Sequence, residues 1–227
     1  MAITYRDAKV ISNEEISKDI YKLVVEDNSE IKAGQFYMLK LNGATFLPRP
    51  ISICEKSGDK LTFLYAVMGT GTKEFTKLKE NDEIALTGPL GNGFDLEKDY
   101  NKVALVAGGI GTAPMLELAK KLRETYPNKE IIYYILPQAW AWKKGRVKKL
   151  EAYCSKLCSI IPFESEIYND KNKITYVGHP LLDEIHDFKE ELATSNKIAF
   201  MPGSRKTEIT NLMPIFRELI KKIPNKE

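Results

Sequence analysis

"VALVAGGIGTAPM", residues 103–115, decides the fold of this chain. Its first half is a continuous apolar stretch of the kind that is buried on both faces in a parallel sheet. The residues that follow, 113–126, carry apolar side chains at helical spacing. Gly108, Gly109 and Gly111 lie between the two patterns, so the sequence predicts a strand, a tight turn and a helix.

The glycine turn of this unit has the chemistry to hold an anion. Backbone amides at the amino end of a helix, together with the helix dipole, favour a dinucleotide phosphate there. The turn lacks the full dinucleotide-binding fingerprint, and no acidic residue stands where a ribose would clearly need it. Taken alone, a tight connection without a ligand is therefore an equal interpretation.

Downstream of this unit, strand and helix patterns alternate. This rhythm predicts an α/β domain with a doubly wound parallel sheet over residues 98–227. The expected strands cover residues 131–136, 157–161, 174–177 and 197–201. The expected helices cover residues 143–153, 180–192 and 206–221, with a short helix in "FESEIY", residues 163–168.

Upstream, residues 1–97 have a different rhythm. Short β-rich stretches such as "DIYKLVVE", "QFYMLKL" and "KLTFLYAV" are separated by turn residues such as "KSGD" and "KEND". Several strands at this spacing indicate an antiparallel barrel or sandwich. The boundary between the two architectures is expected near residues 96–102.

Composition excludes several classes of protein. The 227 residues carry a net charge of +3, so no nucleic acid or other dominant polyanionic partner is indicated. No apolar run reaches the roughly 20 residues that cross a bilayer. Cys54, Cys154 and Cys158 form no disulfide framework and favour a reducing, cytoplasmic location. Neither the cysteines nor the two histidines have the spacing of a metal site.

Two short motifs of the barrel region indicate a cofactor. In "FLPRPISIC", residues 46–54, Arg49 offers a planar fork for phosphate oxygens, and Ser52 can place a hydroxyl near a ring edge. In "VMGTGTKEF", residues 67–75, the glycines allow a close backbone approach to a phosphate, and the threonines add donors. Each motif alone is weak, because either could be an ordinary strand or turn.

The order of these motifs resembles the ferredoxin–NADP reductase superfamily. Residues 1–127 are most similar to the electron-transfer subunit of bacterial dihydroorotate dehydrogenase, including "AGQFYMLKL" at 33–41 and "GPLGNGF" at 88–94. The resemblance implies FAD, NAD(P)H and a catalytic dehydrogenase subunit as partner. It implies FAD contacts at Arg49, Pro50, Ile51, Ser52, Gly69, Thr70, Gly71 and Thr72, and nicotinamide-nucleotide contacts at Gly109, Gly111, Thr112 and Pro114.

One property of these subunits is not expected here. They hold a two-iron, two-sulfur cluster on four cysteine thiolates. This sequence has three cysteines, none of them after Cys158. The sequence therefore predicts no iron–sulfur cluster.

Residues 131–221 resemble a different family, lipid-A-disaccharide synthase. The motifs are "YYILPQAWAWKKGRVKKLEAYCSKLCSIIPFESEIY", "TYVGHPLLDEI" and "IAFMPGSRKTEITNLMPIF", in that order. The resemblance implies a UDP-diacylglucosamine donor, with Ser204 and Arg205 facing its phosphates. Residues 1–130 contain no counterpart of the family's glycine-rich and catalytic acidic segments, so an incomplete glycosyltransferase site is expected.

The chain is therefore predicted to be a chimera with a seam near residues 128–132. Three functions stay open at this point: an FAD-dependent electron-transfer module, a glycosyltransferase fragment, or an inactive hybrid. The basic stretch 140–149, beside two tryptophans, has two interpretations of its own. It is either a solvated helix face or a patch that contacts an anionic membrane. The oligomeric state is left undetermined.

Overall fold

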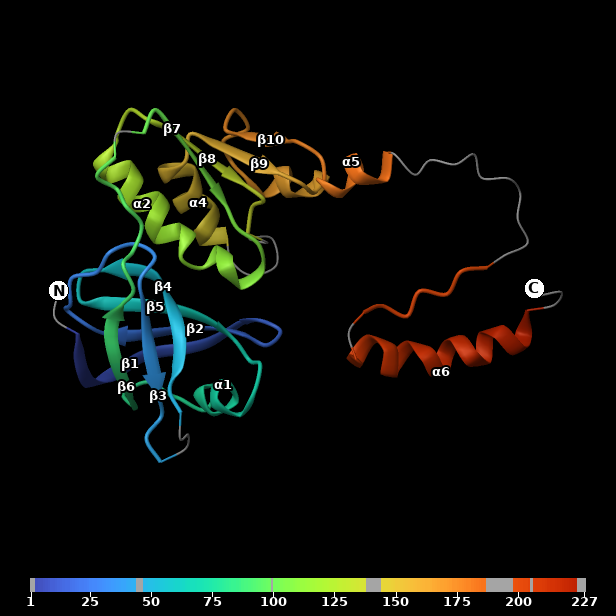
Figure 1. The fold of residues 1–227 in the computed structure, drawn as a ribbon, viewed down its shortest axis with the longest axis horizontal. Helices are drawn as coiled ribbons and strands as arrows, with labels where there is room; N and C mark the ends of the chain where they lie inside the picture. Colours follow the sequence, from blue (N-terminus) through green and yellow to red (C-terminus); the bar gives the residue numbers. More distant parts are fainter. Residues whose placement is uncertain are drawn as a thin grey trace. The chain divides into compact units, whose positions relative to one another are not determined.

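Six strands of the first part of the chain close into an antiparallel barrel in the computed structural model (Figure 1). The structure describes residues 3–43, 47–98, 100–137, 144–186, 198–204 and 206–223. The barrel strands hydrogen-bond in the order β1-β2-β5-β4-β3-β6, which confirms the predicted barrel. Their bounds are β1 Thr4–Ser17, β2 Ile20–Glu26, β3 Phe36–Lys40, β4 Arg49–Ser57, β5 Lys60–Ala66 and β6 Glu83–Leu90.

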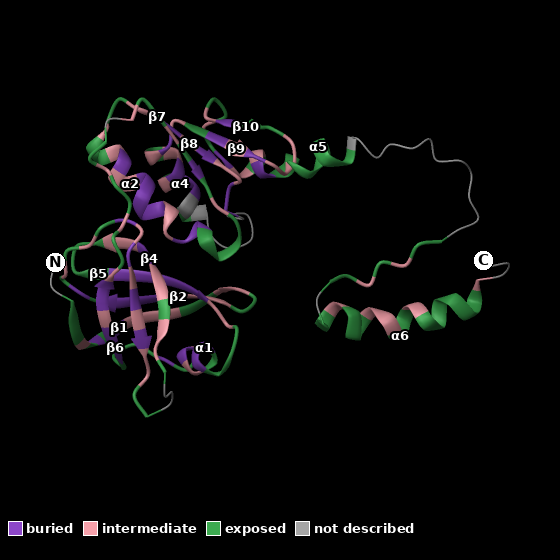
Figure 2. Cartoon of the chain, viewed as in Figure 1, coloured by how far each residue is buried: buried purple, intermediate pink, exposed green. Residues whose placement is uncertain are grey.

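Alternation along the strands builds the barrel core. In β3, Tyr37 and Leu39 are buried while their neighbours are partly exposed. The Tyr37 ring meets Phe63 of β5 edge-on, with 5.8 Å between ring centroids. Phe75, the last residue of helix α1 (Thr70–Phe75), packs edge-on against Tyr65 at the same distance of 5.8 Å. Each such buried ring stabilises the fold by about 1.5–3 kcal/mol. The buried strands of the barrel are visible in Figure 2.

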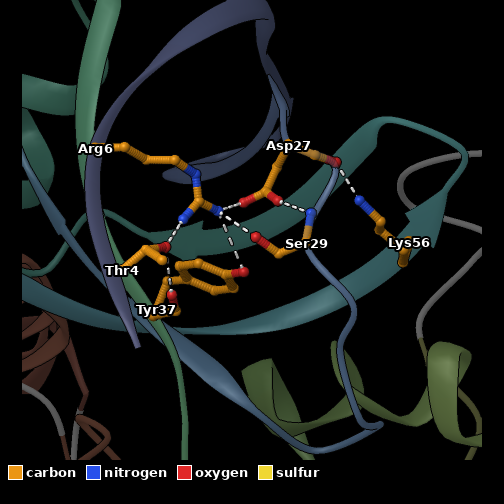
Figure 3. A network of polar contacts seen from close by, with 7 residues as sticks. Thr4, Arg6, Asp27, Ser29, Tyr37 and Lys56 are labelled. Atoms are coloured by element: carbon orange, nitrogen blue, oxygen red, sulfur yellow. Dashed lines mark hydrogen bonds and ion pairs between the residues drawn. The ribbon is translucent and has the colours of Figure 1, made fainter. Parts of the chain in front are cut away.

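A buried ion pair ties three parts of the barrel together (Figure 3). The guanidinium of Arg6 in β1 contacts the carboxylate of Asp27, whose side chain is fully buried. The same carboxylate accepts the backbone N–H of Ser29 at 2.6 Å, and the Asp27 carbonyl accepts a hydrogen bond from the Lys56 ammonium of β4. Arg6 also lies over the Tyr37 ring, 5.6 Å from its centroid. The network fixes the chain where it leaves β2.

The second architecture is a four-stranded parallel sheet with the order β10-β9-β8-β7. Its helices α2 and α4 share one apolar core with buried side chains of the strands, among them Leu105, Ile131, Tyr133 and Leu157. A barrel followed by a parallel α/β sheet agrees with the predicted fold class. The strands are β7 Lys102–Val106, β8 Glu130–Tyr134, β9 Lys156–Ser159 and β10 Ile174–Tyr176. The helices between them are η1 Gly109–Thr112, α2 Met115–Thr125, α4 Lys144–Tyr153 and η2 Pro162–Ile167.

The strands lie side by side in the order in which they occur along the chain, from β7 at one edge of the sheet to β10 at the other. Within the described residues, β7 pairs with β8 alone, and β10 forms the other edge. The ends of the strands are joined by ion pairs: Glu130 lies 2.8 Å from Lys102 and 3.6 Å from Lys156. Along β7, Leu105 is buried but its neighbour Val106 is 58% exposed. β7 is therefore an edge strand whose last side chain is apolar and exposed.

Most predicted elements of the α/β part are present, with bounds that differ by a few residues, but the strand predicted at 197–201 is wrong. Residues 198–201 belong to no sheet, because no strand of the described residues pairs with them. Ile198 is 58% and Met201 81% exposed, whereas Phe200 packs against Phe216, with 5.1 Å between the ring centroids. Of the predicted helix 180–192, the structure describes α5 Leu181–His186.

The chain divides into the units Met1–His179 and Pro180–Glu227. The second unit contains α5 and the helix α6, Lys206–Lys222. Helix α6 has apolar residues at helical spacing, but none of its residues is buried, as Figure 2 shows. Among the helices described, none combines the length and apolar character that a bilayer crossing requires.

Strand β4 of the barrel is joined to the helices of the sheet. The backbone N–H of Lys56 donates to the carboxylate of Glu117 in α2 at 2.9 Å, and the Lys120 ammonium donates to the Lys56 carbonyl at 2.7 Å. Lys149 of α4 forms an ion pair with Glu55. One cation of the predicted membrane patch 140–149 thus lies against the barrel, and residues 138–143 fall outside the described part of the chain.

We expect Glu117→Gln to stabilise the protein at neutral and alkaline pH. Glu117 is fully buried, and its Oε1 has no hydrogen-bond partner within the described residues. Burial is the main cause that raises the pKa of this carboxyl above 4.5. A raised pKa means that the stability present in acid is lost as the pH rises through the folded-state value. The amide keeps the Lys56 hydrogen bond and removes this loss.

The measurement is thermal unfolding of both forms across a pH series. The melting temperature of the variant should exceed that of the native chain above the raised pKa, by about 2–4 °C for each kcal/mol gained, and the gap should close in acid. Glu124→Gln, an exposed position on the same helix, serves as the control. A variant that melts lower at every pH would show that Lys120, 3.9 Å away, stabilises the charged form enough to offset burial.

Candidate functional site

A cavity of about 310 Å³ lies where strands β4 and β5 of the barrel face the glycine turn after β7. We call it the barrel cavity. It brings Arg49 and Ser52 together with Gly111, although these residues are far apart in the sequence. The residues that line it are Arg49, Pro50, Ile51, Ser52, Leu64, Tyr65, Ala66, Met68, Thr72, Ile110, Gly111, Ala113 and Pro114.

The position of Arg49 at the cavity depends on Gly71. The Arg49 guanidinium donates through Nη1 to the carbonyls of Leu47 at 3.1 Å and Pro48 at 3.3 Å. A Cβ on Gly71 would lie 2.4 Å from Arg49 Nε. Glycine at position 71 therefore leaves the space that the guanidinium occupies, a coupling between the two predicted motifs that the sequence did not reveal.

The "GTGT" segment is the start of a short helix and not an open turn. Gly69 is the N-cap of α1, and the Thr72 hydroxyl accepts the backbone N–H of Met68 at 2.9 Å. The same hydroxyl lies 3.2 Å from the Gly69 carbonyl, to which it donates. Thr72 is thus engaged by its own backbone, while Gly69 and Thr70 are exposed beside the cavity.

The glycine turn after β7 differs from the prediction in one respect. A short 3-10 helix, η1, stands between the strand and α2, so the glycines are not at the amino end of α2, whose first residue is Met115. The glycines therefore lie at the start of η1, and α2 begins four residues after Gly111. Gly109 has a φ of +55°, which favours glycine, and a Cβ on Gly108 or Gly111 would meet nothing within 4 Å.

A second cavity of about 310 Å³ lies at the carboxyl ends of the parallel strands. We call it the sheet cavity. Open α/β sheets bind ligands at this edge. Ile110 lines both cavities, so the two are neighbours. Ile135, directly after β8, has a φ of +62°, a strained value for a β-branched residue. The lining residues are Ser17, Ile20, Ala107, Gly108, Gly109, Ile110, Thr112, Ile135, Leu136, Pro137, Ile160, Ile161 and Glu164.

Glu164 is the residue of the sheet cavity that sequence reasoning missed. It lies in η2, only 2% exposed, and Ser159 at the end of β9 donates to its Oε2 at 2.8 Å. The pattern "FESEIY" predicted a short helix there but gave no reason to single out one of its two glutamates. Burial distinguishes them, because Glu166 is exposed.

The structure describes one of the two predicted glycosyltransferase residues. Ser204 is exposed in the second unit, and Arg205 lies outside the described residues. Within the part of the chain that the structure describes, no group of three or more histidine, cysteine, aspartate or glutamate side chains could hold a metal ion.

Comparison with known families gives two different answers along the chain. Residues 110–226, just over half of the 227, match the family model described as lipid-A-disaccharide synthetase. By this match the chain belongs to the lipid-A-disaccharide synthetase family. The lipid-A-disaccharide synthase of Helicobacter pylori is 52% identical over 101 residues, which cover 44% of this chain and 27% of that protein.

A second relative matches as strongly. The "dihydroorotate dehydrogenase B (NAD(+)), electron transfer subunit" of Clostridium perfringens is 57% identical over 131 residues, 58% of this chain and 52% of that protein. Both predicted resemblances are thus confirmed, and this member of the lipid-A-disaccharide synthetase family is also similar to an electron-transfer subunit. The chain spans about half the length of the Clostridium relative and about a quarter of the Helicobacter one.

A solved structure has a similar fold. The ferredoxin–NADP⁺ reductase of Plasmodium falciparum superposes with a TM-score of 0.58 and 17% identity, covering 93% of this chain and 83% of that one. At this identity the likeness concerns the fold alone. It confirms the predicted reductase-like architecture.

Proposed function

We propose that this chain is an FAD-binding, NAD(P)H-linked electron-transfer module, similar in role to the electron-transfer subunit of dihydroorotate dehydrogenase. The observation that carries the proposal is the barrel cavity, which joins Arg49 and Ser52 to Gly111 and Pro114. The Clostridium relative, whose name states electron transfer and NAD⁺, supports it.

The residues of the barrel cavity fit an isoalloxazine dinucleotide. Arg49 provides a fixed cation for phosphate oxygens, held in place by two backbone carbonyls and by the space at Gly71. Pro50, Ile51 and Ser52 would line the ring and offer it a hydroxyl, while the backbone beside Gly69 and Thr70 would border the phosphate side. When bound, FAD supplies the chemistry of accepting two electrons and passing them on singly or in pairs.

The sheet cavity would take the nicotinamide nucleotide. Gly109 and Thr112 line it, and Ile110 borders both cavities, so the two ligands would approach each other at this residue. The protein's role is to hold the two rings together and to exclude water from between them. A catalytic dehydrogenase subunit would receive the electrons. An iron–sulfur cluster is no part of this proposal, because four thiolates are needed and three cysteines are present.

We also propose that residues 1–97 form the flavin domain and residues 98–227 the nucleotide domain, with the seam near 128–132. The matches to two families support a hybrid origin. The ladder between β7 and β8 supports the physical continuity of the sheet across the seam, since Val103 pairs with Ile131 and Leu105 with Tyr133.

The test is the absorbance spectrum of the purified chain after incubation with FAD and desalting. A retained flavin spectrum that bleaches on addition of NADH or NADPH without oxygen supports the module. A preparation that stays colourless after incubation with FAD would refute it. Retention without bleaching would leave a flavin site and remove the nicotinamide half of the proposal.

A second candidate is glycosyl transfer from a UDP-diacylglucosamine donor, which the family match over residues 110–226 favours. In this function Ser204 and Arg205 would face the donor phosphates. The assay is release of UDP when the donor is mixed with an acylated sugar-phosphate acceptor. Release that depends on Arg205 would favour this candidate, and its absence with both substrates present would remove it.

A further inference from the structure

We propose that Glu164 recognises the ribose hydroxyls of the nucleotide in the sheet cavity, and thereby selects a dinucleotide with a free 2′-hydroxyl over its 2′-phosphorylated counterpart. The inference rests on the proposed function. Glu164 lies within the stretch that matches the lipid-A-disaccharide synthetase family, whereas the barrel residues of the cavity precede that stretch. Glu164 would thus bind a ligand in a cavity that is partly lined by barrel residues from outside the matched stretch.

The carboxylate of Glu164 is held in a fixed position. The hydroxyl of Ser159, fully buried at the end of β9, lies 2.8 Å from Oε2 and 2.6 Å from the Ile161 carbonyl, so the two acceptors share its proton, and the Glu164 backbone N–H donates to the Ile161 carbonyl at 3.2 Å. The Ser159 hydroxyl in turn accepts the Ile161 N–H at 3.2 Å. These contacts orient the side chain without a large entropic cost on binding, because it is already immobile.

Acceptor capacity remains on this carboxylate. A carboxylate accepts up to about four hydrogen bonds, and Ser159 uses one of its oxygens. No lysine or arginine of the described residues forms an ion pair with Glu164, which is 98% buried beside the cavity. A buried carboxylate without a cation is costly unless donors reach it. Two adjacent hydroxyl groups of a ligand would supply such donors.

The place of Glu164 in the sheet favours a ribose. The glycine turn follows β7, and Glu164 follows β9, two strands away in the same sheet. Neighbouring strands are about 4.8 Å apart, so the two walls of the cavity are separated by roughly 10 Å. A nucleotide whose phosphates lie along the turn would extend its ribose towards η2. In dinucleotide-binding sheets, a carboxylate that accepts ribose hydroxyls is compatible with NAD but not with a 2′-phosphate.

The selectivity follows from charge. A 2′-phosphate would place a second anion against a buried carboxylate, and such a juxtaposition costs several kcal/mol. Glu164→Gln keeps the size of the side chain and its contact with Ser159 but removes the charge. The variant should therefore tolerate the 2′-phosphate.

The experiment is isothermal titration calorimetry of the full chain with NAD⁺ and NADP⁺, the oxidised forms, so that no electron transfer accompanies binding. The native chain should bind NAD⁺ at least about tenfold more tightly than NADP⁺. Glu164→Gln should reduce this ratio by about tenfold, chiefly through tighter binding of NADP⁺. Glu166→Gln, on the same short helix but exposed, should leave the ratio unchanged.

The outcomes separate this inference from the proposed function. Equal affinities of the native chain for the two nucleotides, or a ratio that Glu164→Gln does not alter, would overturn the inference while flavin retention upholds the module. Binding of FAD but of neither nucleotide would overturn the inference and the nicotinamide half together. Equal affinities of the native chain would overturn the inference even if the variant does not fold.

Discussion

Arg49→Ala is expected to weaken FAD binding by about 10- to 100-fold, as measured by fluorescence titration of the apoprotein. A charge-assisted hydrogen bond contributes about 1.5–3 kcal/mol, and the guanidinium is the cation of the described barrel-cavity lining. The alanine would leave the flavin phosphates facing the carbonyls of Leu47 and Pro48, which repel them. The fold should persist, because Arg49 is partly exposed and contributes little to the barrel core.

Gly71→Ala tests the same site without touching the cation. Its Cβ would lie 2.4 Å from Arg49 Nε, so the guanidinium must move away from its present position. We expect a loss of FAD affinity of the same sign and a similar size. Lys73→Ala, an exposed position of α1, is the matched control and should bind FAD as the native chain does. Unchanged affinity in both Arg49→Ala and Gly71→Ala would refute the role assigned to Arg49.

Arg6→Met is expected to destabilise the barrel by about 3 kcal/mol in chemical denaturation. Removing one member of a buried ion pair leaves the other uncompensated, which costs about 3–5 kcal/mol, and the partial exposure of Arg6 places the effect at the lower end. The fully buried Asp27 carboxylate would retain the Ser29 amide as a donor. The melting temperature should fall by about 6–12 °C.

The double variant Arg6→Met, Asp27→Asn supplies the comparison. Without the charge at position 27, the loss at position 6 should be much smaller, so the cycle isolates the pair. FAD affinity at low temperature should be unchanged, because neither residue lines the barrel cavity. A single Arg6→Met variant within 0.5 kcal/mol of the native chain (about the usual surface effect) would show that the pair does not stabilise the barrel.

Sequence reasoning was most successful where local patterns dominate. Alternation predicted the barrel, because each strand buries one face against a common core. The residue types at Arg49 and Ser52 were sufficient to suggest a phosphate and ring site, and the structure places both at one cavity. The expected strand at 197–201 failed because a strand also needs a partner, which no local pattern records. Its apolar residues satisfy β-propensity without specifying a neighbour.

Contacts between particular residues in the folded chain could not be predicted from the sequence. Gly71 was predicted to allow a close approach to a phosphate, and the structure adds that it makes space for Arg49. Thr72 was predicted to offer a donor to a ligand, and the structure adds that its hydroxyl donates to the Gly69 carbonyl. Glu164 was indistinguishable from its neighbour Glu166 until burial separated them. In each case the role depends on a group distant in sequence or on the local backbone geometry.

The order of the parallel strands leaves β7 at an edge of the sheet, and this position affects how the protein behaves in concentrated solution. Within the described residues, β7 offers one side of its backbone to no other strand, and Val106 at its end is 58% exposed. Unprotected strands of this kind recruit further chains by main-chain pairing, and Lys102, the charged residue of β7, is already paired with Glu130. Concentrated solutions should therefore self-associate.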